Sequence, residues 1–190
     1  MGRIIVTEFV SLDGVMEAPG GGESFEHAGW TFEIARGAEG DQYKLDETLD
    51  SEALLLGRVT YQGFAAAWPS MSGPFADKFN SMPKYVVSST LEKAAWNNST
   101  VLGGDVVEEV GKLKARLRGN IVVHGSARLA QTLIEHGLVD ELRLMVFPVV
   151  LGSGKRLFGH TSGKRRLELA SSKTVGDGIV ILTYRAPGER

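Results

Sequence analysis

The chain has 190 residues, with 21 lysines and arginines against 23 aspartates and glutamates and a formal net charge of −2. Because domains average on the order of 150 residues, a single domain over residues 1–190 is expected. A charge so close to neutral offers no basic surface of the kind that binds nucleic acid or anionic membranes. The chain has no cysteine, which excludes disulfides, thiolate metal sites and a cysteine nucleophile.

The first residues contain a short apolar run interrupted by Glu8, which is unlike a secretory signal. Apolar stretches of about 18 residues, long enough to span a membrane, are absent from the sequence. The lack of cysteine also fits a reducing compartment. We therefore expect a cytoplasmic protein that does not contact membranes.

The expected elements begin with a strand over residues 3–10, which is rich in β-branched side chains. A loop over residues 11–28 and a helix over residues 38–49 follow. Residues 53–56 form a short, continuous apolar run, which is typical of a strand covered on both faces. This run ends at a glycine and leads into a helix over residues 58–68.

The middle of the chain continues this alternation of strands and helices. Asp105 and Glu108 have the spacing of a capping box, and apolar residues recur every three to four positions after them. Gly137 marks the end of a later helix. Further strands are expected at residues 85–87, 100–102 and 121–123, and further helices at 105–117 and 127–136, with one helical turn near 75–79.

The last third contains three expected strands without helices between them, at residues 141–150, 165–175 and 179–185. We therefore predict an α/β fold with a mixed, mostly parallel sheet of about eight strands, to which this third adds antiparallel strands.

The strand over residues 141–149 is apolar on both sides of its pleat. A second copy of the chain would cover the second face, which predicts a homodimer. Alternatively, the strand is central and helices from earlier in the chain cover both faces.

Small and hydroxyl residues follow three of the expected buried strands. Ligands bind at the carboxyl ends of the strands in open α/β sheets, and the free N–H groups of a helix start favour an anion. Two such helix starts suit a dinucleotide that carries several phosphates. Alternatively, each of these residues is only a cap or a turn. The set comprises Gly57, Arg58, Thr60, Ser88, Ser89, His124, Gly125, Ser126 and Ala127.

Other motifs do not match known sites. The first strand is not followed by G-x-G-x-x-G, and the sequence contains no G-x-S-x-G elbow. Residues 152–156 lack the spacing of a phosphate-binding P-loop. The four histidines show no metal-binding spacing, so no metal site is expected. Asp13 lies in a Ser-Leu-Asp-Gly segment after the first strand, where its carboxylate either shapes a turn or positions a substrate N–H group.

These segments, in this order, resemble the dihydrofolate reductase-like superfamily, and specifically the reductase domain of bacterial riboflavin biosynthesis and its stand-alone relatives. Together they cover almost the whole chain. The matching segments are residues 11–14 (SLDG), 53–61 (ALLLGRVTY), 84–89 (KYVVSS), 124–127 (HGSA), 137–142 (GLVDEL) and 148–154 (PVVLGSG).

The resemblance implies a three-layer fold, a sheet of eight or nine strands with helices on both faces, and NADPH along the strand ends. It implies that Gly57, Arg58 and Thr60 hold the phosphates on the adenosine side. Gly125, Ser126 and Ala127 would cradle the pyrophosphate, and Ser88 and Ser89 would lie beside the adenosine. It further implies a loop over the nicotinamide that begins at residues 11–14, including Ser11 and Gly14, and a dimer formed through the late strands.

The chain also departs from the family pattern. Residues 62–69 (QGFAAAWP) replace an Asp-Asp-Pro-like substrate segment, and Thr7 and Glu8 stand where a lysine is usual in the first strand. The zinc deaminase domain that is often fused to such reductases is missing. The folate reductases carry an acid on the first long helix, for which Glu33, Asp41 and Asp46 are the candidates.

The sequence thus predicts an NADPH-dependent reductase that transfers a hydride to a C=N or C=O carbon of a small pteridine-like or ribosylaminopyrimidine-like substrate, resembling 5-amino-6-(5-phosphoribosylamino)uracil reductase. Asp13 and Glu8 are the candidate catalytic groups. Alternatives are an NADP-binding module without turnover and a ligand-free dimeric scaffold. The aromatic residues that would wall the substrate pocket, or belong to the core instead, are Trp30, Tyr61, Phe64 and Trp68.

Overall fold

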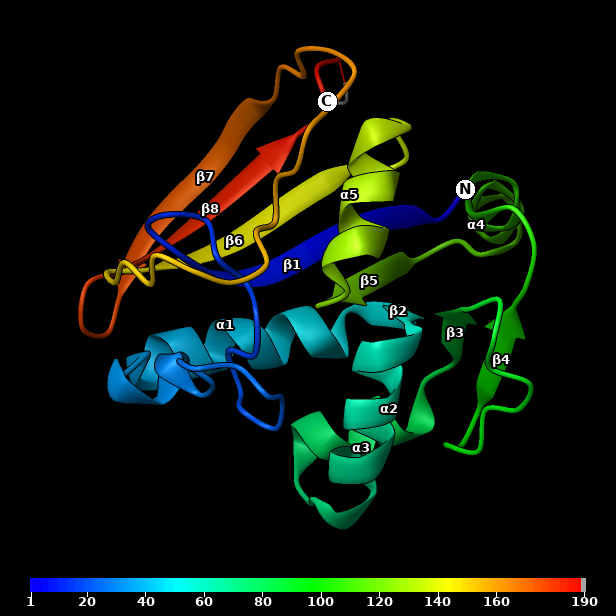
Figure 1. The fold of residues 1–190 in the computed structure, drawn as a ribbon, viewed down its shortest axis with the longest axis horizontal. Coiled ribbons are helices and arrows are strands. Elements are labelled where there is room, and N and C mark those ends of the chain that lie inside the picture. The colour runs from blue at the N-terminus through cyan, green and yellow to red at the C-terminus, as the bar shows by residue number, and fades with distance from the viewer. Residues whose placement is uncertain (189–190) are drawn as a thin grey trace.

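The computed structural model describes residues 1–188. In this range the chain forms one eight-stranded sheet with the order β4-β3-β2-β5-β1-β6-β8-β7 (Figure 1). The strands are β1 (Arg3–Ser11), β2 (Ser51–Gly57), β3 (Lys84–Val87), β4 (Ser99–Leu102), β5 (Asn120–His124), β6 (Glu141–Phe147), β7 (Glu168–Val175) and β8 (Ile179–Arg185). The helices are α1 (Gly37–Leu49), α2 (Arg58–Ala67), α3 (Pro74–Ser81), α4 (Val106–Arg116) and α5 (Ala127–Glu135), with short 3-10 helices η1 (Trp30–Glu33) and η2 (Trp68–Ser70).

The helices cover the two faces of the sheet in separate groups. Leu55 of β2 belongs to an apolar cluster with α4 and α5, whereas Leu54 and Leu56 belong to a second cluster with α2 and α3. A third cluster contains Trp30 of η1 and is flanked by Tyr43 of α1. Successive side chains of a strand point to opposite faces, so both faces are covered. The predicted α/β fold with a mixed, mostly parallel sheet and helices on both faces is confirmed.

The prediction for the last third of the chain needs one correction. β6 pairs in parallel with β1, with Ile5 opposite Glu141 and Ser11 opposite Phe147. The helix α5 lies between β5 and β6 and supplies the crossover that a parallel neighbour requires. Only β8 and β7 are antiparallel additions. β7 also begins at Glu168, three residues later than expected.

The strand β6 is central, so its apolar character on both faces has an explanation within one chain. Leu142 and Leu144 pack in the cluster of α4 and α5, and Met145 and Phe147 pack with Trp30 on the other side. Of the two alternatives for this strand, the structure therefore supports coverage from earlier in the chain. The homodimer remains a prediction that this strand alone does not justify.

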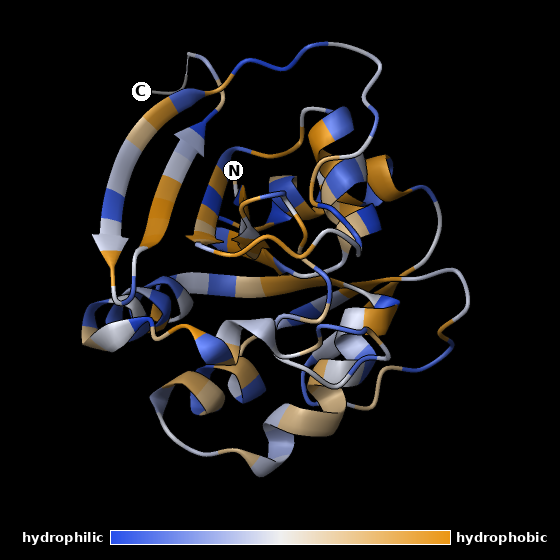
Figure 2. Cartoon of the chain, turned by 60° about the vertical axis from the view of Figure 1, so that its left-hand side comes forward, coloured by the Kyte–Doolittle hydropathy of each residue, from blue (hydrophilic) through white to orange (hydrophobic). Residues whose placement is uncertain are grey.

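The last two strands of the sheet, β8 and β7, differ in hydropathy. In Figure 2, β8 is orange over most of its length, whereas β7 alternates between orange, pale and blue segments. Every residue of β7 except Val175 is exposed.

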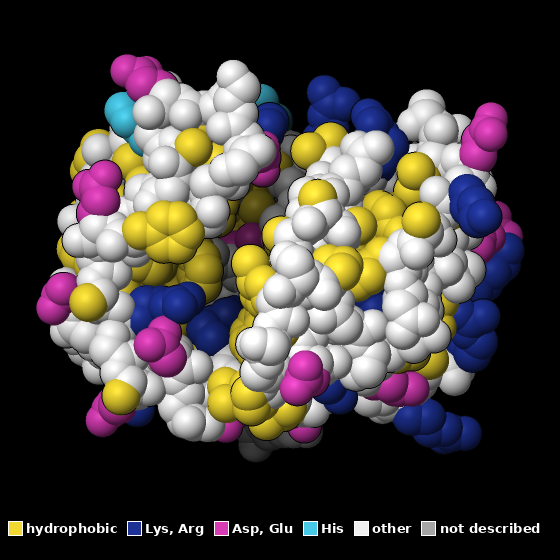
Figure 3. Space-filling model, turned by 90° about the horizontal axis from the view of Figure 1, so that it is seen from below, with side chains coloured by type: hydrophobic (Ala, Val, Ile, Leu, Met, Phe, Trp, Pro, Cys, Tyr) yellow, Lys and Arg dark blue, Asp and Glu magenta, His cyan; other side chains and the backbone are white. Residues whose placement is uncertain are grey.

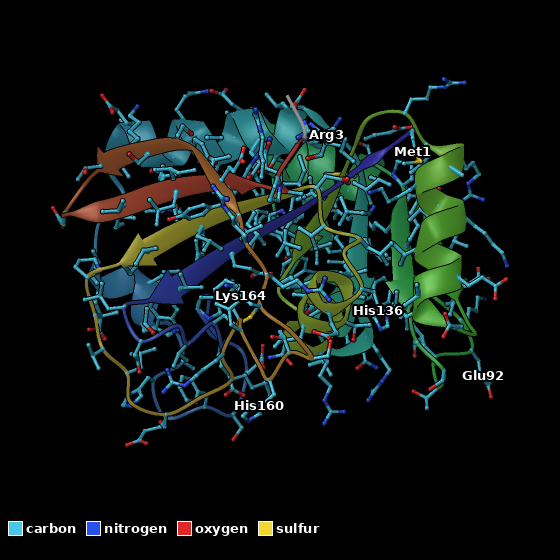
Figure 4. All side chains as sticks on the ribbon, turned by 90° about the horizontal axis from the view of Figure 1, so that it is seen from above. Met1, Arg3, Glu92, His136, His160 and Lys164 are labelled. Carbon is cyan, nitrogen blue, oxygen red and sulfur yellow. The ribbon has the colours of Figure 1, made fainter. Side chains whose placement is uncertain are left out.

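Figure 4 shows His160 and Lys164 on the segment that joins β6 to β7, on the opposite side of these strands from α1. Among residues 1–188, no helix combines the length and the apolarity that a membrane crossing requires.

Candidate functional site

The carboxyl ends of β2 and β5 meet at one point of the sheet edge. The two strands are parallel neighbours, with Leu55 opposite Val123, so the helices that follow them start side by side. The backbone N–H of Gly57 donates a hydrogen bond of 2.8 Å to Oγ of Ser126. That hydroxyl in turn donates to Oγ1 of Thr60 at 2.9 Å. The structure thus brings together predicted site residues that lie up to 69 positions apart.

Two glycines permit this close approach. A Cβ atom at Gly57 would lie 3.0 Å from Oγ of Ser126, and one at Gly125 would lie 3.0 Å from the side chain of Thr60. Gly125 also has a φ of +62°, in the left-handed region that disfavours side chains. A side chain at either position would occupy the narrow space between the two helix starts.

The N–H groups at both helix starts point toward this edge. The residue before α2 is Gly57, which has no side chain that could cap the helix. The residue before α5 is Ser126, which adopts a left-handed conformation with φ 62° and ψ 61°, and its hydroxyl does not cap the helix. Within residues 1–188, neither helix start receives a side-chain cap. Two uncapped helix starts form a natural binding surface for anions.

Arg58, Ser88 and Ser89 flank this pair of helix starts. Arg58 is exposed and donates from Nη1 to the side chain of Gln62 at 3.2 Å. Ser88 follows β3, which pairs with β2, and its hydroxyl accepts the N–H of Leu91 at 2.9 Å. Ser88 therefore shapes the turn after β3, and Ser89 is exposed beside it.

Asp13 joins two loops that are distant in sequence. Its Oδ1 accepts the hydroxyl of Ser11 at 2.6 Å and the N–H of Leu151 at 3.1 Å, and its Oδ2 accepts the N–H of Gly152 at 2.9 Å. The hydrogen bond from Ser11 and those from the backbone hold the pKa of Asp13 below its usual range. Arg156 also donates to the Asp13 carbonyl. These contacts fasten the loop, so they account for Asp13 without a role in catalysis; such a role stays a prediction.

Further bonds continue the fastening of this loop. The N–H of Leu157 donates to the carbonyl of Gly14 at 3.0 Å, and the N–H of Met16 donates to the carbonyl of Lys155 at 2.8 Å. Glu17 accepts the N–H of Lys155 at 2.8 Å and pairs with its ammonium at 2.5 Å. The segment that begins at Ser11 is therefore tied to residues 149–157 along its first third.

Glu8 lies directly beside the glycine turn. Its side chain is buried, and Oε2 accepts the N–H of Gly125 at 3.0 Å. Burial raises the pKa of Glu8 well above its ordinary value. Its other oxygen, Oε1, is buried without a hydrogen-bond partner among the described residues.

His124 lies at the end of β5 on the opposite face from Glu8. It is opposite Thr7 in the pairing of β5 with β1, and its ring lies 5.3 Å from that of Phe79 and 6.5 Å from that of Phe64. Burial among these rings lowers the pKa of His124 to about 3. The imidazole is therefore neutral at physiological pH.

The sequence did not predict a network of buried charged side chains that lies below this site. Lys44 of α1 donates to Oγ1 of Thr7 at 2.8 Å and pairs with Glu47, which also accepts the Thr7 hydroxyl at 2.9 Å. Arg143 of β6 reaches Glu47 at 3.5 Å and Glu141 at 2.5 Å. The mixed polar sequence of α1 is typical of a solvent-facing helix, so nothing in it signalled buried charges.

Of the three acids proposed for the first long helix, Asp41 and Asp46 lie on α1 and Glu33 lies on η1, but none of them is buried. Glu33, Asp41 and Asp46 are all exposed. Asp41 pairs with Arg36 at 3.0 Å, and Asp46 accepts a bond of 2.7 Å from Gln42. The buried acid of α1 is Glu47 instead. The aromatic residues Trp30 and Tyr61 are core residues, and Phe64 and Trp68 pack around Phe79.

The surface next to the site is hollowed. Figure 3 shows a groove between the side that carries α2 and α3 and the side that carries α1 and the loop before it, with hydrophobic and charged side chains along both walls. A separate open pocket of about 720 Å³ lies on the outer side of α2, where it contacts Tyr61 but none of the predicted catalytic or cofactor-binding residues. Among residues 1–188, no cluster of three or more histidine, aspartate or glutamate side chains is suited to hold a metal ion.

The chain matches known proteins over nearly its whole length. The family model described as RibD C-terminal domain matches residues 3–181. The chain is 31% identical over 191 residues to the uncharacterized protein YyaP of Bacillus subtilis, covering 98% of this chain and 96% of that protein.

Two solved structures share the fold. A putative riboflavin biosynthesis protein from Shewanella sp. PV-4 has a TM-score of 0.78 at 22% identity, with 96% of this chain and 98% of that chain covered. Dihydrofolate reductase from Enterococcus faecalis, solved with NADP(H), has a TM-score of 0.60 at 16% identity, with 98% and 97% covered. Together with the family match over nearly its whole length, these findings show that the chain belongs to the RibD C-terminal domain family.

Proposed function

We propose that this protein is an NADPH-dependent reductase that transfers a hydride to a C=N or C=O carbon of a small pteridine-like or ribosylaminopyrimidine-like molecule. Membership of the RibD C-terminal domain family and the likeness to a dihydrofolate reductase support an oxidoreductase. The observation that carries the cofactor proposal is the junction of the α2 and α5 starts, where Ser126 bonds to Gly57 and Thr60.

The residues at this junction fit a dinucleotide. A Cβ at Gly57 or Gly125 would press on Ser126 or Thr60, so the two glycines let the helix starts lie close together. This closeness brings the N–H groups of both helix starts to one place, where a phosphate would bind. In this proposal Gly125 forms the turn, with its own N–H bonded to Glu8, and the N–H groups of Ser126 and Ala127 hold the pyrophosphate. Arg58 and Thr60 hold the additional ribose phosphate, with Ser88 and Ser89 beside the adenosine.

The cofactor, when bound, supplies the hydride, and the protein supplies orientation and exclusion of water. The loop fastened by Asp13 closes one side of the groove, so this carboxylate acts by ordering the loop. Thr7 and neutral His124 line the opposite side of the sheet from Glu8, next to the buried Lys44. The N–H of His124 and the ammonium of Lys44 are the donors that would orient a polar substrate ring, because the Thr7 hydroxyl already donates to Glu47.

The test is the affinity for NADPH and for NADH, measured by titration calorimetry on the wild-type chain and on Arg58→Ala. The variant should lose about 1.5–3 kcal/mol of NADPH binding, the range for hydrogen bonds to charged groups. NADH binding should hardly change. Arg118→Ala is the matched control, because Arg118 is an exposed arginine that precedes the amino end of β5, at the opposite edge of the sheet from the carboxyl ends of the strands. Equal losses for both cofactors would show that Arg58 does not bind the additional phosphate.

An assay of NADPH oxidation distinguishes a reductase from a protein that binds the cofactor without turnover. A panel of pteridine and ribosylaminopyrimidine substrates should include one that oxidises NADPH, followed by absorbance of the reduced nicotinamide. Stoichiometric binding without oxidation across the panel would favour the module. No binding of either cofactor would leave the ligand-free scaffold.

We also propose that two copies associate through the open end of the sheet. A groove of about 340 Å³ there is lined by Leu142, Leu144, Phe158, Arg165, Leu167, Leu182 and Tyr184. The neighbouring strand β7 is an exposed edge, and an exposed edge beside apolar residues favours pairing with another chain. A two-fold contact would cover both copies alike. Sedimentation at micromolar concentration should show a dimer, and a monomer of 20.5 kDa would contradict the proposal.

A further inference from the structure

The contact between Glu8 and Gly125 is unusual for a carboxyl group. Glu8 is 5% exposed, and its Oε2 accepts one hydrogen bond, from the N–H of Gly125 at 3.0 Å. Oε1 is buried and has no partner in the described part of the chain. Buried carboxylates normally have several donors or a cation in contact, because an unpaired buried charge is costly. The geometry therefore suits a neutral carboxyl, with the hydroxyl on Oε1.

The charged groups around Glu8 do not change this. Lys44 and Glu47 on α1 act on it with opposite signs and are paired with each other. His124 on β5 is neutral, and Arg143 on β6 is paired with Glu47 and Glu141. On α5, Arg128 is exposed. Desolvation by burial is the largest cause of the raised pKa of Glu8, and this burial favours the neutral form of the carboxyl.

Gly125 connects this carboxyl to the cofactor junction. Gly125 and Ser126 adopt consecutive left-handed conformations, with φ of 62° at each, and the Ser126 side chain bonds to Gly57 and Thr60. Oε2 of Glu8 thus holds the first N–H of the turn whose following N–H groups face the ligand. A negative charge on Glu8 would lie against the phosphates that this turn is proposed to bind.

We propose that Glu8 is a positioning residue for the glycine turn, and that its ionisation weakens the binding of a phosphate-bearing cofactor there. This inference rests on the proposed cofactor site. It makes the affinity of the site dependent on pH, because binding of an anion favours the protonated carboxyl, and loss of that proton opposes binding.

The experiment compares the wild-type chain with Glu8→Gln, whose amide keeps the size and neutrality of the protonated acid at every pH. NADPH dissociation constants are measured from about pH 7 to 9.5, above the second ionisation of the ribose phosphate near 6. The wild-type affinity should fall roughly fivefold or more across this range, whereas that of Glu8→Gln should change less than about twofold. Glu108→Gln, an exposed carboxylate on α4, should keep the wild-type profile.

A second measurement works without cofactor. The backbone amide resonance of Gly125 should titrate with pH in the unliganded wild-type chain, and this titration should vanish in Glu8→Gln. Thermal unfolding confirms that the variant is folded. Identical pH profiles of binding in the two proteins, or an amide of Gly125 that does not titrate, would overturn the inference. Failure of both proteins to bind NADPH at pH 7 would instead overturn the proposed cofactor site, together with the claim about affinity.

Discussion

The two ends of the sheet differ in how their faces are covered. In the parallel part, from β4 to β1, helices cover both faces, and the strand ends carry the glycines and hydroxyls of the candidate site. In the antiparallel part, α1 and η1 cover one face of β6 and β8, while the opposite side of the sheet near β7 leaves Leu167 and Leu169 at 38% and 55% exposure. Parallel strands require crossover helices, which bury them, whereas antiparallel strands tolerate one open face. The buried part thus carries the proposed ligand site, and the open part carries the proposed dimer contact.

The largest effect is expected at the covered face of the antiparallel part. Phe147 is fully buried, with its ring 5.5 Å from Phe9 and 5.3 Å from Trp30. Phe147→Lys should cost roughly 4 kcal/mol or more, because it buries a charge and removes an aromatic side chain. Urea unfolding followed by circular dichroism should show little folded protein. Stability close to wild type would mean that this face is open as well. Neither Phe147→Lys nor Met145→Lys is therefore a useful probe of a dimer.

A smaller loss is expected at Lys84 in the parallel part. Its ammonium is buried and donates to the carbonyls of Asn80, Met82 and Asn97 at 3.0, 2.8 and 2.9 Å, over the ring of Trp96. Lys84→Met would leave these carbonyls without their donor, at a cost of about 2–4 kcal/mol. The measurement is the free energy of unfolding in urea, and a loss below about 1 kcal/mol would contradict the buried role.

The burial of Lys84 also predicts that the stability of the folded chain depends on pH. Burial lowers the pKa of Lys84 to about 8 in the folded chain, whereas the unfolded value is about 10.4. Between these two values the unfolded state binds more protons, so this group makes stability rise with pH. Relative to Lys84→Met, the wild-type chain should gain stability from pH 8 to 10. A constant difference between the two proteins over this range would contradict the shift.

Next in size is the glycine turn. Gly125→Ala forces a left-handed φ on a side chain and sets its Cβ 3.0 Å from Thr60, which should cost about 1–2 kcal/mol of stability. It should also weaken NADPH binding at least tenfold, because the methyl group presses on Thr60 and so disturbs the two helix starts that form the proposed phosphate site. Gly63→Ala in α2, where a Cβ meets nothing within 4 Å, is the control and should leave binding unchanged. Normal binding by Gly125→Ala would place the phosphates elsewhere.

The smallest effect on stability is expected at the open face. Leu169→Lys replaces an exposed residue and should change the free energy of unfolding of the monomer by less than about 0.5 kcal/mol. If two copies meet at this end of the sheet, the same change should shift sedimentation from dimer toward monomer. A dimer unaffected by Leu169→Lys would show that the two copies meet at another surface. The difference between Leu169→Lys and Phe147→Lys would then reflect only their effects on folding.

Much of the fold was predictable because its determinants are local. The apolar runs at β2 and β5 end at a glycine or lead directly into one, and Asp105 accepts the N–H of Glu108 at 2.9 Å, as its capping-box spacing predicted. Such signals act over a few residues, through the pleat, the helical repeat and the turn. The meeting of Gly57 with Ser126 followed in turn from the rule that ligands bind where parallel strands end.

Other features had no local signal. The carboxylate of Asp13 is bonded to Gly152, 139 positions away, and that of Glu8 to Gly125, 117 positions away. Lys44 and Glu47 are buried because α1 lies over Thr7 and Arg143. The sequence by itself determined the order of strands and helices and the character of the strand ends, since these depend on neighbouring residues. Tertiary structure alone decided which carboxyl is fastened, which has a raised pKa and that both faces of β6 are covered, because strand register and helix packing join residues that the chain keeps far apart.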